Sequence, residues 1–249
     1  MLDRLKMSAH SMVTKMAQMD AITNNLANIN TKGYKREGLF VNELQKQIKS
    51  LEAAHFGKNT SLPQVGSIID FTQGALTKTE QPFDVAISGD GLFSIDTPRG
   101  EAYTRDGRFT INSDGILTTV DGLTVLGQGG PVEIDLQQNN TSDIIINDQG
   151  EIIVNGNVVD TLKVVAIGDA RRFKRIGGNL YQLKDATQEP ELLANPAVKQ
   201  GFLEDSNVNP VSEMVAMIDI YRSYQTNEKL LQSQDFLLNK TVNEIGRVN

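Results

Sequence analysis

Hydrophobic residues recur every seven positions at both ends of this 249-residue chain, and this pattern constrains the fold more strongly than any other. A spacing of seven keeps side chains on one face of a helix. At the N-terminal end it predicts one long amphipathic helix over residues 2–29, which stops where Asn and Gly residues favour turns. Its apolar stripe contains Leu5, Met12, Met16, Met19 and Leu26.

The C-terminal end predicts a second long helix, over residues 211–245. Asn209 suits the N-cap, Pro210 suits the first helical position, and Glu213 suits the positive end of the helix dipole. Both helices would greatly exceed the average of about 11–12 residues, which favours a role in joining other chains. The stripe of the second helix contains Met214, Met217, Tyr221, Tyr224, Leu231 and Leu238.

Between these ends, residues 67–185 alternate short β-prone runs with Asp-Gly and Asn-Gly pairs, which favour hairpin turns. The predicted fold class is therefore α+β, with long N- and C-terminal α-helices paired as a coiled-coil-like stalk and a central antiparallel all-β domain. The expected parts are a discontinuous helical assembly domain at 1–35 and 207–249, a connecting region at 36–82 and 186–206, and a β-rich outer domain at 83–185.

Composition argues against most kinds of chemistry. The chain has no cysteine, which excludes disulfides, thiol nucleophiles and thiolate metal sites. Its two histidines, His10 and His55, lie where neither a catalytic triad nor a zinc site is expected. The net charge of −7 disfavours binding to nucleic acid or to an anionic membrane. We therefore expect no enzyme activity, no cofactor, no metal, no small-molecule substrate and no membrane insertion.

Several short motifs resemble functional signatures but lack the required context. The Asp-Gly pairs lack the spacing of calcium loops, and the glycine-rich run at 127–131 precedes a strand-like segment instead of the helix of a phosphate loop. Residues 32–34 begin like an RNA-binding signature, but Lys35 stands where a small residue is needed. The basic run at 171–175 is interpreted as a solvated hairpin tip or as a contact with an acidic patch on a neighbouring copy.

Four blocks together resemble the bacterial flagellar rod and hook family. The first is Asn-Asn-Leu-Ala-Asn-Ile-Asn-Thr-Lys-Gly-Tyr-Lys-Arg at 24–36, which adds Asn24, Asn25 and Asn28 to the candidate interface residues. The second joins Phe-Thr-Gln-Gly-Ala-Leu at 71–76 to Pro-Phe-Asp-Val-Ala-Ile at 82–87. The third is Tyr-Thr-Arg-Asp-Gly-Arg-Phe at 103–109, and the fourth covers 203–214 with Tyr221–Gln225.

This resemblance implies a structural axial subunit of the basal-body rod that crosses the periplasm, without enzymatic activity. The implied partners are other copies of the chain, related rod and hook proteins, and the flagellar type III export apparatus, which would export the chain without a cleaved Sec signal. Residues 1–4 and 125–131 resemble a proximal rod component, whereas residues 63–66 lean towards a distal one. We expect a proximal position.

Two other classes of protein compete with this interpretation. A secreted β-rich binding or adhesin module could use the same helices as a private oligomerising stalk. A hydrolase would need a pair of carboxylates in one pocket, which no local sequence pattern reveals.

Overall fold

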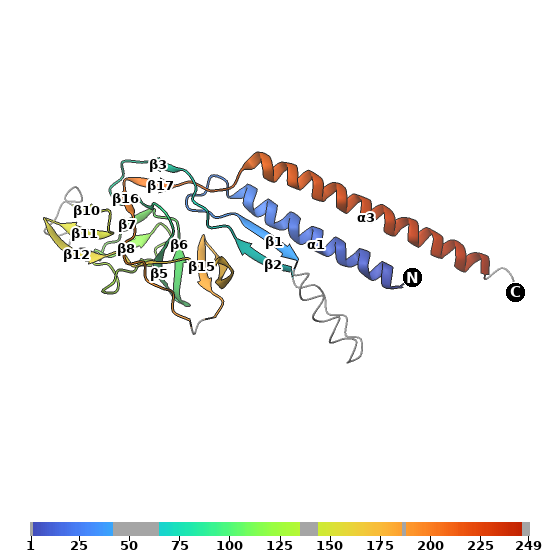
Figure 1. The fold of residues 1–249 in the computed structure, drawn as a ribbon, viewed down its shortest axis with the longest axis horizontal. Coiled ribbons are helices and arrows are strands. Elements are labelled where there is room, and N and C mark those ends of the chain that lie inside the picture. The colour runs from blue at the N-terminus through green and yellow to red at the C-terminus, as the bar shows by residue number, and fades with distance from the viewer. Residues whose placement is uncertain (1, 42–64, 135–143, 186–187, 246–249) are drawn as a thin grey trace. The chain divides into compact units, whose positions relative to one another are not determined.

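The computed structural model describes residues 2–41, 65–134, 144–185 and 188–245 (Figure 1). The chain divides into two compact units. We call the first the helical unit; it comprises Met1–Leu26, Glu37–Ser67 and Asn209–Asn249. We call the second the β body; it comprises Ala27–Arg36 and Ile68–Val208.

The helical unit contains α1 (Leu2–Ala27) and α3 (Pro210–Ile245), with β1 (Glu37–Val41) paired to β2 (Val65–Ile69) in a two-stranded sheet. Helix α3 begins at a capped end, because Asn209 Oδ1 accepts hydrogen bonds from the backbone N–H groups of residues 211 and 212 at 3.0 and 3.2 Å. Neither helix, over the residues the structure describes, is long and apolar enough to span a membrane.

The predicted fold class is wrong, because the helices do not form a coiled-coil stalk. A coiled coil buries the apolar positions of its seam. Among the described side chains of α1 and α3, however, Ile22 is the only buried hydrophobic one, while Met16 and Tyr221 of the predicted stripes are 53% and 49% exposed. Hydrogen bonds between polar side chains link the two helices, from Asn25 to Glu213 and from Asn227 to Ser11. Most of the regular structure is instead a large β-rich body.

The main sheet of the β body has eight strands and is antiparallel throughout. Seven strands follow one another in space, and β13 pairs with β5 beside this path. In spatial order they are β14 (Phe173–Gly177), β15 (Leu180–Leu183), β6 (Gly100–Thr104), β5 (Leu92–Thr97), β9 (Thr124–Val125), β8 (Leu117–Thr119) and β7 (Phe109–Ile111), with β13 at Val164–Val165.

Three smaller antiparallel sheets complete the body. In the three-stranded sheet, Asn155 and Gly156 form a two-residue turn with φ of 52° and 81°, which is the left-handed backbone that an Asn-Gly hairpin requires. The strands of that sheet are β10 (Ile144–Ile146), β11 (Glu151–Val154) and β12 (Asn157–Thr161); β16 (Val198–Gln200) pairs with β4 (Val85–Ile87), and β17 (Phe202–Glu204) pairs with β3 (Leu76–Lys78). A 3-10 helix, η2, covers Ala170–Arg172.

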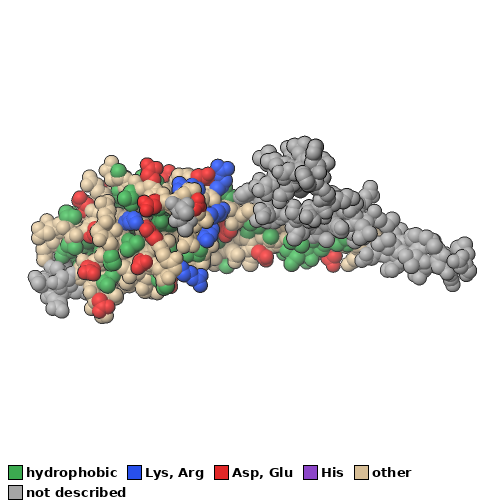
Figure 2. Space-filling view, turned by 90° about the horizontal axis from the view of Figure 1, so that it is seen from below, with side chains coloured by type: hydrophobic (Ala, Val, Ile, Leu, Met, Phe, Trp, Pro, Cys, Tyr) green, Lys and Arg blue, Asp and Glu red, His purple; other side chains and the backbone are tan. Residues whose placement is uncertain are grey.

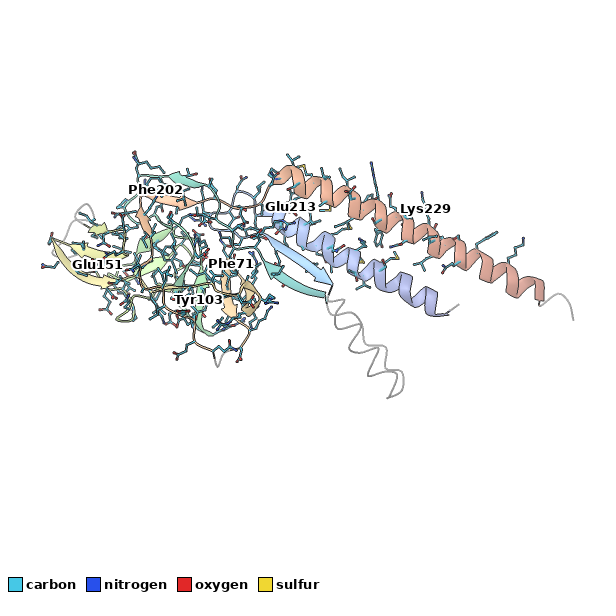
Figure 3. The ribbon with its side chains drawn as sticks, viewed as in Figure 1. Phe71, Tyr103, Glu151, Phe202, Glu213 and Lys229 are labelled. Atoms are coloured by element: carbon cyan, nitrogen blue, oxygen red, sulfur yellow. The ribbon has the colours of Figure 1, made fainter. Side chains whose placement is uncertain are left out.

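The core of the β body lies on both faces of the main sheet. Successive side chains of a strand point to opposite faces. Accordingly Phe93 of β5 belongs to a core that extends to β10 and β11, whereas its neighbour Leu92 packs in a second core with Phe71, Tyr103 and others. The second core is aromatic, with the rings of Phe71 and Phe173 in edge contact at 5.6 Å. Phe71 and Tyr103 of this core are labelled in Figure 3. Strand β5 is thus buried on both sides.

Candidate assembly site

Three charged side chains from distant parts of the sequence meet inside the β body. Lys35 follows the N-terminal helix, Arg105 follows β6, and Glu204 ends β17. Lys35 Nζ and Arg105 Nε each lie 2.5 Å from a different carboxylate oxygen of Glu204. All three side chains are at most 1% exposed. We call these residues the ion cluster.

Every proton of the Lys35 ammonium has an acceptor. Besides Glu204 Oε1, Lys35 Nζ donates to the backbone carbonyl oxygens of Phe71 at 3.2 Å and Thr72 at 2.7 Å. Burial lowers the pKa of Lys35 as the largest effect, the carboxylate of Glu204 opposes this, and the nearby Arg105 adds to it. The more distant carboxylate of Asp70 also opposes the effect of burial on the Lys35 pKa.

The Arg105 guanidinium, like the Lys35 ammonium, donates several hydrogen bonds. It donates to Glu204 Oε2, to the carbonyl oxygen of Ile87 at 2.9 Å, and to the carbonyl oxygens of Gly89 and Gly91. A planar guanidinium donates hydrogen bonds to several acceptors in fixed directions, whereas the ammonium of a lysine lacks this rigid donor geometry. Arg105 therefore ties the turn after β4 to the end of β17.

The second sequence block, at 71–76 and 82–87, contacts the ion cluster through a backbone group. The N–H of Gly74 donates to Glu204 Oε1 at 2.8 Å. A Cβ atom at this position would lie 2.0 Å from the carbonyl oxygen of Asp205, so only glycine allows the approach. All four blocks singled out in the sequence thus contribute to one buried polar arrangement.

A more exposed ion pair, between Lys32 and Asp205, lies beside the cluster in the sequence segments that form it. Hydrogen bonds from Lys32 and Thr77 to Asp205 hold the pKa of that carboxyl below its ordinary value. A carboxyl whose pKa is lowered by folding contributes stability at neutral pH, and that contribution is lost as the pH falls through the folded-state pKa.

Lys32→Gln is therefore expected to raise the pKa of Asp205 towards its ordinary value of 3.8, because the largest cause of the lowering is removed. The effect on stability should stay below about 1 kcal/mol, since both side chains are partly exposed. Carbon-detected NMR titration of the Asp205 carboxyl measures the shift. Lys78→Gln is the control, because Lys78 pairs with Glu80 instead; an Asp205 pKa that stays unchanged in Lys32→Gln contradicts the assignment.

In the helical unit, Asn25 joins three elements. Its side chain donates to the carbonyl oxygen of Glu37 at 2.9 Å and to Glu213 Oε2 at 3.3 Å, and its Oδ1 accepts from the N–H of Glu37 at 2.9 Å. Asn25 and Glu213 are 0% and 1% exposed, and Glu213 lies in the first turn of α3 (Figure 3). A second contact, from Asn227 Nδ2 to Ser11 Oγ at 3.2 Å, makes the two helices antiparallel neighbours.

The predicted interface residues fall into four groups, of which the first is the buried Asn25 alone. Met12, Met19, Leu26, Asn28, Met217, Tyr224 and Leu231 are half-buried, whereas Asn24, Met16, Met214 and Tyr221 are exposed. Leu5 and Leu238 lie within α1 and α3, but their side chains lie outside the described part of the structure. The described side chains of the two stripes are therefore unequally exposed, and their role as an interface stays a prediction.

Sequence reasoning named only Met214 and Tyr221 of an exposed apolar stripe on α3 and missed its other three residues. Its residues are Val211, Met214, Val215, Ile218 and Tyr221, each between 49% and 68% exposed. Their spacing of three and four places them on one helix face. The half-buried Met217 and Tyr224 share a helix face with Glu213 and Asn227, whose side chains form hydrogen bonds with α1. We call the exposed face the α3 stripe; Figure 2 shows hydrophobic side chains gathered on the described part of the helical unit.

The basic run at 171–175 is not simply a solvated tip. Arg171 pairs with Asp169 at the surface, and Lys174 is exposed. Phe173, in contrast, is buried in the second core, and the guanidinium carbon of Arg175 lies 4.2 Å from the ring centre of Tyr34. Charge alone gave no hint of this stacking, because Tyr34 is distant in sequence; the second aromatic partner, Tyr181, lies opposite Arg175 in the β14–β15 hairpin.

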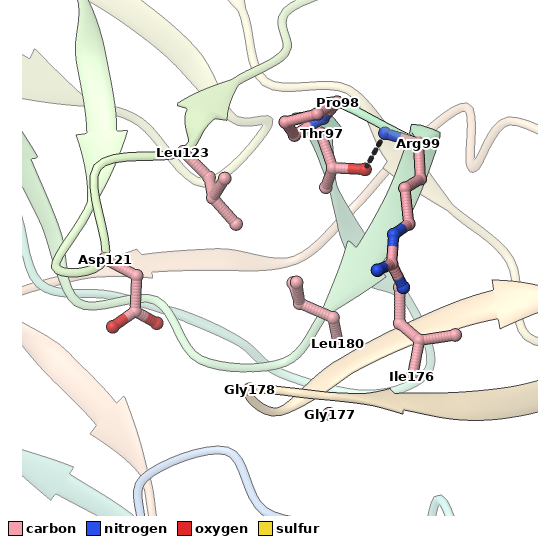
Figure 4. Close-up of a pocket in the computed structure, with 9 residues that line it drawn as sticks. All are labelled: Thr97, Pro98, Arg99, Asp121, Leu123, Ile176, Gly177, Gly178 and Leu180. Carbon is pink, nitrogen blue, oxygen red and sulfur yellow. Dashed lines mark hydrogen bonds between the residues drawn. The ribbon is translucent and has the colours of Figure 1, made fainter.

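The described surface also contains a shallow pocket of about 400 Å³ (Figure 4). Arg99 and Asp121 stand at its rim, and Leu123 and Leu180 are among the apolar residues that line it. Asp121 is the single carboxylate of this pocket, so the paired acids that a hydrolase needs are not assembled in it. Among the described residues, no three His, Asp or Glu side chains lie close enough together to hold a metal ion.

Three family models match parts of the chain that contain most of the first block and all of the third and fourth. The chain matches the family model described as flagella basal body rod protein over residues 12–35, and the flagellar hook protein FlgE/F/G D1 domain over 86–154. It also matches the flagellar basal body rod FlgEFG protein C-terminal model over 199–244. The three matches contain Lys35, Arg105 and Glu204 respectively.

Similar proteins cover nearly the whole chain. The flagellar basal-body rod protein FlgF of Caulobacter vibrioides is 35% identical over 95% of both chains. The flagellar basal-body rod protein FlgG of Bacillus subtilis is 32% identical over 98% of this chain and 99% of its own, and that of Buchnera aphidicola subsp. Acyrthosiphon pisum is 31% identical over 96% and 98%. The chain therefore belongs to the flagellar basal-body rod protein family.

Proposed function

We propose that this protein is a structural axial subunit of the flagellar basal-body rod and that it polymerises through side chains of its terminal helices into the hollow drive shaft. The observation that carries the proposal is the α3 stripe. Soluble monomers rarely expose contiguous apolar patches of more than a few hundred Å², and such patches usually mark interaction sites. A helix face with this spacing fits another helix packed along it.

The proposed interface combines the α3 stripe with the residues singled out in the sequence. The exposed side chains of this set can contact a neighbouring subunit directly. The half-buried side chains would instead fix the positions of the helices that form the contact surface. Methionines suit such a surface because their flexible side chains adapt to partners that are related but not identical. The proposed set is Leu5, Met12, Met16, Met19, Asn24, Asn25, Leu26, Asn28, Met214, Met217, Tyr221, Tyr224, Leu231 and Leu238.

The proposed partners are other copies of this chain and related rod and hook proteins, with the flagellar export apparatus as a transient partner. The subunit would lie where the rod crosses the periplasm and would reach it without a cleaved Sec signal. A proximal position in the rod is supported by residues 1–4 and 125–131. The proposed role is mechanical and needs no catalysis.

Detection of the chain in purified basal bodies tests this proposal. An epitope tag inserted at the exposed turn Asn155–Gly156 avoids both helices and the ion cluster, since this turn joins β11 and β12. Immunogold labelling is expected to mark the rod, and deletion of the gene is expected to abolish swimming. A tagged, functional protein found only at the outer cell surface supports the adhesin alternative instead.

A further inference from the structure

We call the five residues Lys32–Arg36 the strap. The rest of the β body contacts the strap as a receptor contacts a bound peptide. The strap has no regular secondary structure in the described chain, yet Tyr34 and Lys35 are 3% and 0% exposed. Such burial of an irregular segment requires partners for its backbone groups.

The first set of partners comes from the segment that follows β17. The N–H of Gly33 donates to the carbonyl oxygen of Glu204 at 2.7 Å, and the N–H of Arg36 donates to Asn207 Oδ1 at 2.7 Å. The N–H of Asn207 donates in turn to the carbonyl oxygen of Tyr34 at 3.4 Å. These contacts resemble the main-chain bonding by which extended peptides bind to a protein edge.

The second set comes from the β14–β15 hairpin. Asn179 Nδ2 donates to the carbonyl oxygen of Lys32 at 2.7 Å, and Arg175 donates to the carbonyl oxygen of Lys35. The Arg175 guanidinium also lies over the rings of Tyr34 and Tyr181, at 4.2 and 5.2 Å from their centres. We call Arg175, Asn179, Tyr181, Glu204 and Asn207 the seat.

We propose that the seat is a peptide-binding site for a Lys-Gly-Tyr-Lys segment that turns at its glycine. The protein's own strap occupies the site, and the same segment of a second copy can take it when that strap is absent. Main-chain hydrogen bonds supply affinity. Selectivity comes from the stacking of Tyr34 on Arg175 and from the Lys35 ammonium on Glu204. The proposal does not depend on the role in the rod, because every contact lies within the β body.

Gly33→Val is the variant that empties the seat. Gly33 has φ of +67°, and a Cβ atom there would lie 2.4 Å from the backbone nitrogen of Asp106. Gly168→Val is the matched control, because Gly168 has φ of +54° but no atom within 4 Å of the added Cβ. The control therefore has a similar backbone strain without the clash.

The probe is a fluorescent synthetic peptide with the sequence of residues 28–37, added to the full-length chain and followed by anisotropy. The Gly33→Val chain is expected to bind it at least tenfold more tightly than the wild type or Gly168→Val. A tethered strap competes at an effective concentration on the order of mM. Adding Asn179→Ala to Gly33→Val is expected to weaken binding again, and a scrambled peptide is expected not to bind.

A folded Gly33→Val chain that ignores the peptide overturns the proposal, as does equal binding by the wild type. Circular dichroism and the melting temperature, compared with those of Gly168→Val, decide whether the chain is folded. If Gly33→Val does not fold, Tyr34→Ala takes its place, since it weakens the strap without a backbone clash. A peptide with Tyr at that position must then bind more tightly than one with Ala; equal binding of the two peptides refutes the site.

Discussion

Glu204→Gln is expected to lower the free energy of unfolding by about 3–5 kcal/mol, which is the usual cost of removing one partner from a buried ion pair. Among the described residues, Glu204 is the one acidic group that pairs with Lys35 and Arg105, and all three side chains are at most 1% exposed. A glutamine keeps the volume but leaves two buried cations without a compensating charge. It also turns an NH2 group towards the donors of Lys35 or Arg105.

Urea denaturation followed by circular dichroism measures this change. The denaturation midpoint should fall while the slope stays the same, because the substitution alters stability and not the surface exposed on unfolding. Glu80→Gln is the matched control: its pair with Lys78 is exposed, and its loss is expected to cost less than about 1 kcal/mol. If Glu204→Gln costs no more than Glu80→Gln, the ion cluster does not stabilise the body.

Local sequence signals were reliable where the structure depends on neighbouring residues. The Asn209-Pro210 pair predicted the start of a helix because its cap involves only the next three residues. The Asn155-Gly156 pair marked a hairpin because only residues that tolerate positive φ fit a two-residue turn. The paired stalk failed for a different reason. A heptad pattern shows which side chains share a face, but it does not show what covers that face, and here the described side chains of the stripes are half-buried or exposed instead of buried in a seam.

The ion cluster could not be predicted from local sequence signals. Glu204 is 99 positions from Arg105 and 169 from Lys35, and no periodicity links residues at such separations. Each residue does lie within a block that supported the family resemblance, so the blocks pointed to the right segments without revealing their contact. Arg175 shows the same limitation, since its basic neighbours suggested solvent while its partner Tyr34 came from the far end of the chain.

Ile218→Asp is expected to reduce incorporation of the subunit into basal bodies at least tenfold, because it places a charge at the centre of the α3 stripe. A tenfold loss corresponds to about 1.4 kcal/mol, and an unpaired charge in a dry interface costs more than this. Ile218 is 52% exposed in the single chain, so the substitution should leave the free energy of unfolding within about 0.5 kcal/mol of wild type.

Two controls separate an interface effect from a general one. Ile218→Leu keeps an apolar side chain of the same size and should incorporate normally, whereas Thr110→Asp adds the same charge on the exposed surface of β7 and should also be tolerated. Quantitative immunoblots of purified basal bodies, with swimming speed beside them, report the outcome. If Ile218→Asp incorporates as well as Ile218→Leu, the α3 stripe lies outside the subunit interface, and contacts between rod subunits must be sought on other surfaces. The opposite outcome is a stable Ile218→Asp monomer that fails to incorporate while both controls incorporate normally. In that case, the contacts that stabilise the assembly involve a helix face that the isolated chain exposes to solvent.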